Sequence, residues 1–216
     1  MSYEVILFDL DGTLTDPKVG ITKSVQYALA KFNIYESDLD KLVPFIGPPL
    51  VESFQEFYSL SKEQAVAGVG YYREYFTKAG IFENAVYPGI KELLALLAAA
   101  GKQLIIATSK PTLYSEQIVE YFGLTQFFQS IVGSNLDGSR IDKAEIIDYI
   151  LSELAGVDRK NVVMVGDRKH DIVGAQKNEV AVIAVKYGYG TAAELQAAKP
   201  TYTVSTVNEL AEMLQA

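Results

Sequence analysis

Two aspartates near the start of the chain, Asp9 and Asp11, come directly at the end of a short apolar run. The run Val5–Leu10 is typical of a buried strand. Because side chains alternate along an extended segment, we expect Asp9 and Asp11 to point the same way and to bring two carboxylates together. Like charges this close need a cation, and hard carboxylate oxygens favour Mg²⁺. Gly12 then allows a sharp turn beside them.

A second pair of carboxylates, Asp167 and Asp171, follows another apolar run, Val162–Gly166. The two aspartates are four positions apart, so at the start of a helix they face the same point. The ordinary alternative is that one of them only caps that helix. Two strand ends that both carry acidic residues favour a shared metal site.

Hydroxyl and ammonium groups follow a third apolar run, Leu104–Thr108, in the segment Thr108, Ser109 and Lys110. Such groups can hold a phosphoryl oxygen, although Ser and Thr also serve as turn or cap residues. Lys143 opens a helical pattern and could bring a compact positive charge to the same place. Its ordinary alternative is a solvated surface lysine.

The elements that must position these residues alternate between strand and helix. Helical spacing of apolar residues extends from Ile90 to Leu97 and from Ile146 to Leu154. Strand and helix in alternation predict an α/β fold, with a Rossmann-like parallel sheet and helices on both faces. Ligands of such a fold collect beyond the carboxyl ends of the strands. The predicted buried strands are Val5–Leu10, Leu104–Thr108, Val162–Gly166 and Ala181–Val185.

One long region interrupts this alternation, because residues 16–87 show helical patterns and no convincing buried strand. Turn-forming segments bound it, Asp16-Pro17 at one side and Tyr87-Pro88-Gly89 at the other. We therefore expect a core catalytic domain of residues 1–15 and 88–216, with an all-helical cap domain of residues 16–87 inserted after the first strand.

Composition excludes several classes of function. The 216 residues include no cysteine, so disulfides, thiolate nucleophiles and cysteine-ligated metals are excluded. The net charge is −8 and the basic residues form no run, so nucleic acid is not an expected partner. No apolar run reaches the roughly 20 residues that span a bilayer, and the first residues do not resemble a signal peptide. We expect a cytoplasmic protein with no membrane association.

Four motifs taken together resemble those of the haloacid dehalogenase superfamily. The insert resembles that superfamily's helical cap, and the segments Tyr187–Gly190 and Phe45–Leu50 resemble its phosphoglycolate phosphatase-like branch. The resemblance covers nearly the whole chain. In chain order, the motifs are Asp9-Leu10-Asp11-Gly12-Thr13, Thr108-Ser109-Lys110, Lys143 and Gly166-Asp167 with Asp171.

The resemblance implies a role for each matching residue. Asp9 would be the nucleophile and a Mg²⁺ ligand. Asp11 would be the general acid and then the general base, with its backbone carbonyl on the metal. Ser109 and Lys143 would hold the transferring phosphoryl group. The metal site would be completed by Asp167, with Asp171 as ligand or support.

Two further assignments concern the substrate. Lys110 follows Ser109 as in many members, so Thr108 and Lys110 would assist phosphate binding. Members often have proline after the lysine of the third motif, whereas here Ala144 follows Lys143. In the insert, a rigid Gly47-Pro48-Pro49 segment is the candidate loop that reaches the substrate, and Gly47 is its predicted contact.

The resulting hypothesis is a Mg²⁺-dependent phosphatase that hydrolyses a small phosphorylated metabolite through an aspartyl-phosphate. The expected activity is that of a phosphoglycolate phosphatase or of a 5'-nucleotidase, and the protein is expected to be a monomer or a homodimer. A dehalogenase has no need of the second carboxylate, Asp11. Two alternatives stay open: a phosphomutase of the same superfamily, and a non-catalytic ligand-binding protein on the same fold.

Overall fold

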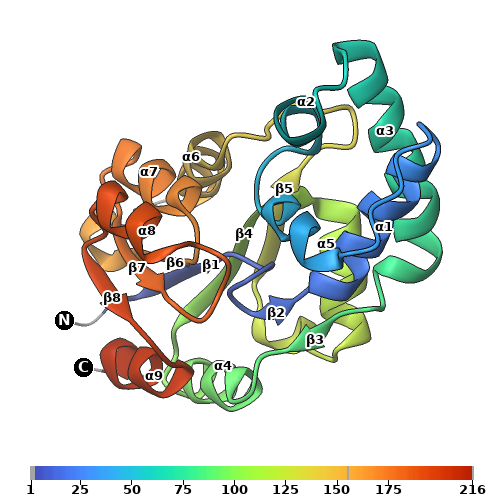
Figure 1. The fold of residues 1–216 in the computed structure, drawn as a ribbon. Helices are drawn as coiled ribbons and strands as arrows, with labels where there is room; N and C mark the ends of the chain where they lie inside the picture. The colour runs from blue at the N-terminus through green and yellow to red at the C-terminus, as the bar shows by residue number, and fades with distance from the viewer. Residues whose placement is uncertain (1–2, 155, 216) are drawn as a thin grey trace. The chain divides into compact units, whose positions relative to one another are not determined.

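The computed structural model describes residues 3–154 and 156–215. Within it the chain forms two compact units (Figure 1). Unit 1 contains Met1–Asp16 and Val86–Ala216, and unit 2 contains Pro17–Ala85. The short strands β2 (Thr15–Asp16) and β3 (Ala85–Val86) pair with each other where the chain leaves unit 1 and returns to it.

Unit 1 is built on a six-stranded sheet with the order β5-β4-β1-β6-β7-β8. Every neighbouring pair is parallel. From β1 the chain moves outward to β4 and β5, and then returns to β6 on the other side of β1. The strand order therefore reverses between β1 and β6, which is where open α/β sheets bind their ligands. The strands are β1 (Val5–Phe8), β4 (Gln103–Pro111), β5 (Ser130–Ser134), β6 (Val162–Gly166), β7 (Ala181–Val185) and β8 (Tyr202–Val204).

Helices cover both faces of this sheet (Figure 1). Helices α6 (Lys143–Glu153), α7 (Lys169–Lys177) and α8 (Ala192–Ala198) pack on one another in sequence along one face. On the other face, α4 (Ile90–Ala99) contacts α9 (Val207–Gln215). Helix α5 (Thr112–Tyr121) packs on β4 and β5. The predicted Rossmann-like α/β fold is confirmed. The short helices η3 (Thr125–Phe127) and η4 (Arg159–Asn161) complete the unit.

The central strands were predictable because they are apolar throughout and buried on both faces. Every residue of β1 and β6 is buried. On one face of the sheet, Val5 and Met164 belong to the same apolar core as Ile146 of α6 and Ile172 of α7. This continuous apolar core holds the carboxyl ends of β1 and β6 in fixed positions.

Four strands and the ends of two others differ from the sequence-based prediction: the short strands β2 and β3 were not predicted, and β1 ends at Phe8 instead of Leu10. The strands β5 and β8 were not predicted, because they lie at the sheet edges and are short and partly polar. The third predicted strand is longer than expected: β4 runs to Pro111, so Ser109 and Lys110 lie within it. Its pairing with β5 shifts register between Ala107 and Pro111, which re-aims the side chains in between.

Unit 2 is helical, as the insert was predicted to be. It contains α1 (Lys18–Ala30), the 3₁₀ helix η1 (Leu39–Phe45), α2 (Leu50–Tyr58), α3 (Lys62–Tyr75) and the π-helical segment η2 (Phe76–Gly80). Helix α3 packs against both α1 and α2. At the centre of the unit, the buried ring of Phe45 lies 5.1 Å from that of Phe54 and 5.3 Å from that of Phe57. A capping box between Ser61 and Gln64 starts α3.

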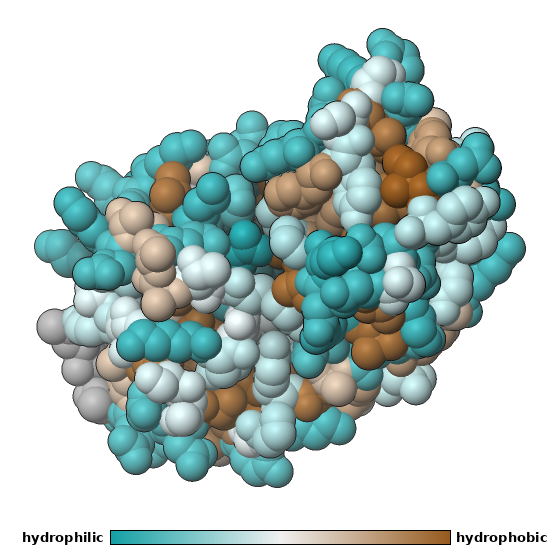
Figure 2. Space-filling view, in the orientation of Figure 1, coloured by the Kyte–Doolittle hydropathy of each residue, from teal (hydrophilic) through white to brown (hydrophobic). Residues whose placement is uncertain are grey.

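The surface gives no sign of a broad apolar face on the side shown in Figure 2. Hydrophilic residues predominate there, and the apolar ones form small separate groups. In residues 3–154 and 156–215, no helix combines the length and the apolar character that crossing a bilayer requires.

Candidate active site

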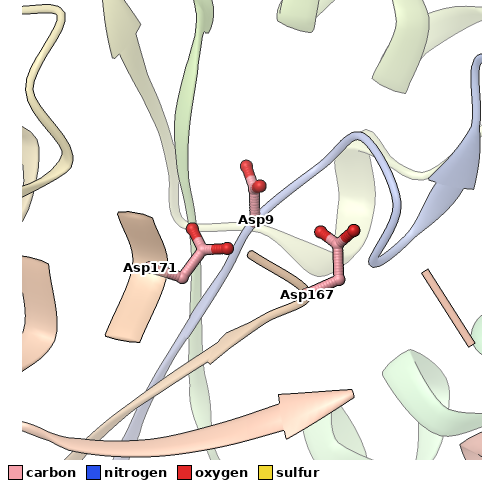
Figure 3. Close-up of side chains that lie close together, drawn as sticks. All are labelled: Asp9, Asp167 and Asp171. Carbon is pink, nitrogen blue, oxygen red and sulfur yellow. The ribbon is translucent and has the colours of Figure 1, made fainter. Parts of the chain in front are cut away.

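Three carboxylates from distant parts of the chain meet at the carboxyl ends of β1 and β6. Asp9 follows β1, Asp167 follows β6, and Asp171 lies in the first turn of α7. One carboxylate oxygen from each lies within 4.8 Å of the others. Figure 3 shows the three side chains close together. All three residues are buried, with 8%, 0% and 1% of their surface exposed. The fold therefore concentrates negative charge where water is largely excluded.

This cluster is electrostatically unfavourable without a cation. Burial raises the pKa of Asp167 well above its usual range, and repulsion from Asp171 and Asp9 raises it further. Burial also raises the pKa of Asp171 to about 6, with Lys143 opposing the shift and Asp9 adding to it. A cation that binds the three oxygens would relieve both penalties.

Hydrogen bonds fix the orientation of the carboxylates. The backbone N–H of Leu10 donates to Asp9 Oδ1 at 2.8 Å. Thr13 Oγ1 donates to Asp167 Oδ1 at 3.3 Å, and the backbone N–H of Tyr189 donates to Asp167 Oδ2 at 2.7 Å. Close approach of the chain to Asp167 depends on Gly12, which has a φ of +85° and whose absent Cβ would lie 2.3 Å from Asp167 Oδ2.

The two carboxylate oxygens of Asp171 contact different partners. Its Oδ2 accepts a hydrogen bond from the backbone N–H of Arg168 at 3.0 Å, which caps α7. Its Oδ1 lies 2.8 Å from Lys143 Nζ. The capping interpretation and the metal-site interpretation are thus both compatible with the geometry, because the two oxygens face different partners.

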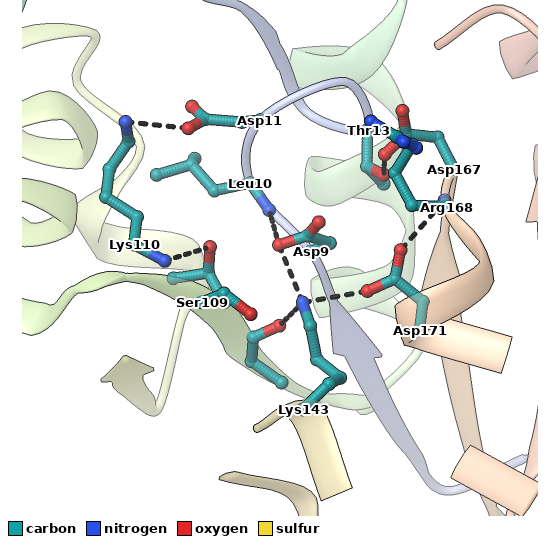
Figure 4. A network of polar contacts seen from close by, with 12 residues as sticks. Asp9, Leu10, Asp11, Thr13, Ser109, Lys110, Lys143, Asp167, Arg168 and Asp171 are labelled. Carbon is teal, nitrogen blue, oxygen red and sulfur yellow. Dashed lines mark hydrogen bonds and ion pairs between the residues drawn. The ribbon is translucent and has the colours of Figure 1, made fainter. Parts of the chain in front are cut away.

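Lys143 is a buried lysine inside the cluster. Only 3% of the residue is exposed, and its Nζ lies 2.9 Å from Asp9 Oδ1 as well as 2.8 Å from Asp171 Oδ1. Nζ also donates to the backbone carbonyl of Ala107 at 2.9 Å (Figure 4). Burial alone would lower the pKa of Lys143, but Asp171 and Asp9 outweigh it and the pKa is raised. The ammonium is therefore charged, and the alternative of a solvated surface lysine is excluded.

Asp11 lies outside the three-carboxylate cluster and pairs with Lys110. Asp11 Oδ2 is 2.6 Å from Lys110 Nζ, and both side chains are largely buried. Within the described residues, Asp11 Oδ1 is buried without a hydrogen-bond partner. Burial raises the pKa of Asp11, whereas Lys110 lowers it. The two carboxylates of the first motif thus pair with different lysines, while repulsion from Asp9 also raises the pKa of Asp11.

The other predicted site residues lie in different parts of the structure. Thr108 is buried, and its Oγ1 accepts from the backbone N–H of Lys110 at 3.3 Å. The backbone carbonyl of Ser109 accepts from Ser134 Oγ at 2.8 Å, and in Figure 4 Ser109 and Lys110 lie on the side of Asp9 away from Asp167. Gly47 belongs to unit 2, where its φ is +106°, and its substrate contact stays a prediction.

Two residues of the site had no role in the sequence-based prediction. Thr13 was part of the first motif, but its hydrogen bond to Asp167 joins residues 154 positions apart. Tyr189 acts through its backbone N–H, which any residue except proline could supply. The only signal for Tyr189 was the Gly-Tyr-Gly sequence after a predicted strand, where glycine permits close approach.

The donor set fits Mg²⁺ in type and charge. All three candidate ligands are carboxylate oxygens, which suit a hard divalent cation, and the set contains neither sulfur nor imidazole. The ammonium of Lys143 offsets only one of the three charges. A divalent cation would compensate the remaining charge.

Known proteins resemble this chain along nearly its whole length. A family model described as haloacid dehalogenase-like hydrolase matches residues 6–185. A 5'-nucleotidase of Pseudomonas aeruginosa is 45% identical over 215 residues, which cover 100% of this chain and 97% of that protein. The crystal structure of a predicted phosphatase from Clostridium acetobutylicum superposes with a TM-score of 0.95 at 46% identity, covering 100% of this chain and 99% of that one.

Relatives with other names are also similar along most of the chain. A tyrosine-protein kinase PtkA of Mycobacterium tuberculosis is 35% identical over 216 residues, with coverage of 99% of this chain and 73% of that protein. A phosphoglycolate phosphatase of Vibrio parahaemolyticus is 27% identical over 220 residues, with coverage of 98% and 96%. The matched family model and the extent of these similarities show that the chain belongs to the haloacid dehalogenase-like hydrolase family.

Proposed function

We propose that this protein is a Mg²⁺-dependent phosphatase that hydrolyses a small phosphomonoester through an aspartyl-phosphate on Asp9. The observation that carries the proposal is the buried group of Asp9, Asp167 and Asp171 with the ammonium of Lys143 inside it. A nucleophilic carboxylate, a divalent-cation site and a fixed positive charge together suit attack on a phosphate ester. The relatives named 5'-nucleotidase and phosphoglycolate phosphatase support the same reaction class.

The carboxylates of Asp9, Asp167 and Asp171, together with the backbone carbonyl of Asp11, would hold the cation. When bound, Mg²⁺ neutralises phosphate oxygens and makes phosphorus accessible to an anionic nucleophile. Thr13 and the N–H of Tyr189 keep Asp167 in place. Such supporting contacts commonly alter metal affinity or activity by about 10–100-fold when removed.

In the first half-reaction, a carboxylate oxygen of Asp9 attacks phosphorus and the bond to the ester oxygen breaks. Protonated Asp11 gives its proton to that leaving oxygen, so the alcohol departs neutral. The raised pKa of Asp11, caused by its burial, favours the protonated form that this step needs. Lys143 and Ser109 hold the phosphoryl oxygens as charge moves between nucleophile and leaving group.

In the second half-reaction, Asp11 is a carboxylate and takes a proton from water. The resulting hydroxide oxygen bonds to phosphorus, the bond to Asp9 breaks, and inorganic phosphate leaves. Asp9 is again a carboxylate and Asp11 is again protonated, so the cycle closes with one water consumed. The pairing of Asp11 Oδ2 with Lys110 leaves Oδ1 for the proton transfers.

Release of phosphate from p-nitrophenyl phosphate tests the activity. We expect turnover with Mg²⁺ and none after EDTA treatment, with recovery when Mg²⁺ is restored. Acid quenching shortly after mixing with ³²P-labelled substrate should trap labelled phosphoryl enzyme in wild type and none in Asp9→Asn. Full turnover without a divalent cation would contradict the metal assignment, and a labelled Asp9→Asn protein would contradict the nucleophile.

The same preparation distinguishes the alternative activities. A non-catalytic ligand-binding protein would release no phosphate from any ester. A phosphomutase would move phosphate between positions of a sugar phosphate faster than it releases phosphate. Because one relative is named a tyrosine kinase, labelled ATP is also supplied, and label that appears on tyrosine without phosphate release would contradict hydrolysis.

The names of the relatives favour two substrate classes, and the cap is the proposed place of selection between them. Similarity to a 5'-nucleotidase favours a nucleoside monophosphate, and similarity to a phosphoglycolate phosphatase favours 2-phosphoglycolate. We propose that the cap residues around Gly47 select between them. Values of kcat/KM for AMP, UMP and phosphoglycolate should change in ranking when Gly47, Pro48 and Pro49 are all replaced by alanine. An unchanged ranking with unchanged rates would place selection elsewhere.

A further inference from the structure

The loop between β7 and α8, residues Tyr187–Gly190, enters the mechanism above only through the backbone N–H of Tyr189, yet the loop lies directly against Asp167. Its backbone approaches most closely at Gly188, where an added Cβ would lie 2.3 Å from the carbonyl oxygen of Gly12 and 2.4 Å from Asp167 Cβ. No side chain fits in that space. The backbone of this loop thus lies directly against Asp167.

Tyr189 contacts two functional parts of unit 1 from opposite ends of the residue. Its backbone N–H donates to Asp167 Oδ2 at 2.7 Å. Its phenol donates to Asp16 Oδ1, and Asp16 is the last residue of unit 1 before the cap begins at Pro17. A single residue therefore bridges a candidate metal ligand and the chain segment that leads into the cap.

Two further tyrosines, Tyr187 and Tyr87, add contacts between the same parts of the chain. The phenol of Tyr187 donates to the backbone carbonyl of Thr13 at 3.0 Å, and Thr13 itself hydrogen-bonds Asp167. The ring of Tyr187 packs edge-on at 5.1 Å against the ring of Tyr87, in the segment where the chain returns from the cap. The backbone N–H of Tyr87 donates to the carbonyl of Leu14 at 3.1 Å, so the outgoing and returning segments are joined.

We propose that Tyr189 is a positioning residue that couples occupancy of the metal site to the order of the two segments connecting core and cap. A cation on Asp167 restrains that carboxylate, and the restraint passes through the N–H of Tyr189 to its phenol and to Asp16. The proposal rests on the proposed function, because it requires a cation to bind at Asp167. It adds a task for Tyr189 that the hydrolytic steps do not require.

The variant Tyr189→Phe removes the phenol and keeps the N–H that Asp167 needs. Isothermal titration of the metal-free protein with Mg²⁺ gives the metal affinity, and amide hydrogen exchange of residues 14–16 and 86–87 gives the order of the connecting segments. In wild type, we expect Mg²⁺ to slow exchange there by about threefold to tenfold. In Tyr189→Phe, this Mg²⁺ effect should fall below about twofold, while the Mg²⁺ dissociation constant changes by less than about threefold.

Matched variants distinguish this coupling from a general loss of order in the connecting segments. Tyr121→Phe removes the phenol of an exposed tyrosine on α5 and should behave as wild type. Asp16→Ala removes the other partner of the hydrogen bond and should reproduce the Tyr189→Phe result, which also covers the case in which one variant does not fold. The double variant should lose no more of the Mg²⁺ effect than Tyr189→Phe alone, because Tyr189→Phe already removes the hydrogen bond to Asp16.

The results of these experiments distinguish failure of the coupling from failure of the proposed function. If wild type binds Mg²⁺ but its connecting segments show no change in exchange, or if Tyr189→Phe keeps the whole effect, the coupling is overturned and the metal site stands. If wild type binds no Mg²⁺ in the titration, both the metal site and the coupling are overturned. Loss of the effect in both Tyr189→Phe and Asp16→Ala, with metal affinity retained, supports the coupling.

Discussion

The ammonium of Lys110 lies 2.6 Å from Oδ2 of Asp11, while Oδ1 of the same carboxyl group is buried without a hydrogen-bond partner among the residues described. Lys110 therefore fixes one oxygen of the proposed acid and leaves the other for proton transfer. If Asp11 is the acid, as proposed, Lys110 would act through Asp11 and not only in phosphate binding.

Replacing Lys110 by methionine should lower kcat by about tenfold for a nucleoside monophosphate, because a freely rotating Asp11 protonates the leaving oxygen less often. For p-nitrophenyl phosphate, whose leaving group needs little protonation, the loss should be smaller. Steady-state rates with both substrates check this, and Lys91→Met, at an exposed position of α4, is the control. Equal losses with the two substrates would contradict a role through Asp11.

The change Asp9→Asn should remove the nucleophile while keeping the size of the side chain. We expect turnover to drop by at least about four orders of magnitude, because no covalent intermediate can form. The melting temperature of the metal-free protein should stay equal to or above that of wild type, since one of three mutually repelling carboxylates is gone. Wild-type turnover in this variant would exclude the covalent mechanism.

Lys143→Ala should lower turnover by about 10²–10³-fold, because it removes a buried electrostatic contact to the phosphoryl group. It also leaves Asp9 and Asp171 without their ammonium partner, so the metal-free protein should lose roughly 3 kcal/mol of unfolding free energy. Urea unfolding and steady-state rates measure the two effects. Lys62→Ala, at the exposed start of α3, is the control and should change neither quantity.

Mg²⁺ affinity should depend on pH through Asp171. Burial raises the pKa of this carboxyl to about 6, and repulsion from Asp9 adds to the shift. Below that pH the metal must displace a proton, so apparent affinity should fall as pH decreases, by up to about tenfold per pH unit for one displaced proton. Above it the affinity should continue to rise, because burial and repulsion from Asp171 also raise the pKa of Asp167 well above its usual range, and that carboxyl must lose its proton as well. Titration calorimetry between about pH 5 and about pH 8 tests this sign, and an affinity that rises toward acid pH would contradict it.

Gly188→Ala should weaken Mg²⁺ binding, because the new Cβ would lie 2.4 Å from Asp167 Cβ and must displace Asp167 or the loop. We expect a loss of about tenfold or more in affinity, in the range typical of changes to the support of a ligand. Gly70→Ala is the matched control, since an added Cβ there meets nothing within 4 Å. Unchanged affinity in Gly188→Ala would mean that the loop adjusts without moving Asp167.

The sequence was informative where one physical signal dominated. The strands β1, β6 and β7 are apolar along nearly their whole length because helices cover both faces, and such runs stand out in any sequence. The helical character of unit 2 was equally plain. The edge strands β5 and β8 were missed although they contain strand-favouring residues such as Ile131 and Tyr202, because polar residues or glycine interrupt their apolar runs and β8 has only 3 residues.

For the site, the types of residue and their places in the chain were enough to indicate the chemistry. Carboxylates after two strands, a serine at the end of another and a lysine at a helix start are typical of a metal-assisted reaction on phosphate. A residue's position after a strand is local information, and the parallel sheet then brings strand ends to one edge whatever the details of packing. The residues Asp9, Asp167, Asp171 and Lys143 could therefore be named as candidates from the sequence.

Only the tertiary structure decided which charged groups face one another. The pairing of Asp11 with Lys110, the burial of Lys143 between two carboxylates, and the two contacts of Tyr189 all join positions far apart in the chain. Alternation along a strand predicted that Asp9 and Asp11 point the same way, but it could not show that each carboxylate pairs with a different lysine. Local sequence sets side-chain chemistry and backbone preference, whereas partners, burial and the resulting pKa shifts depend on how separate segments pack.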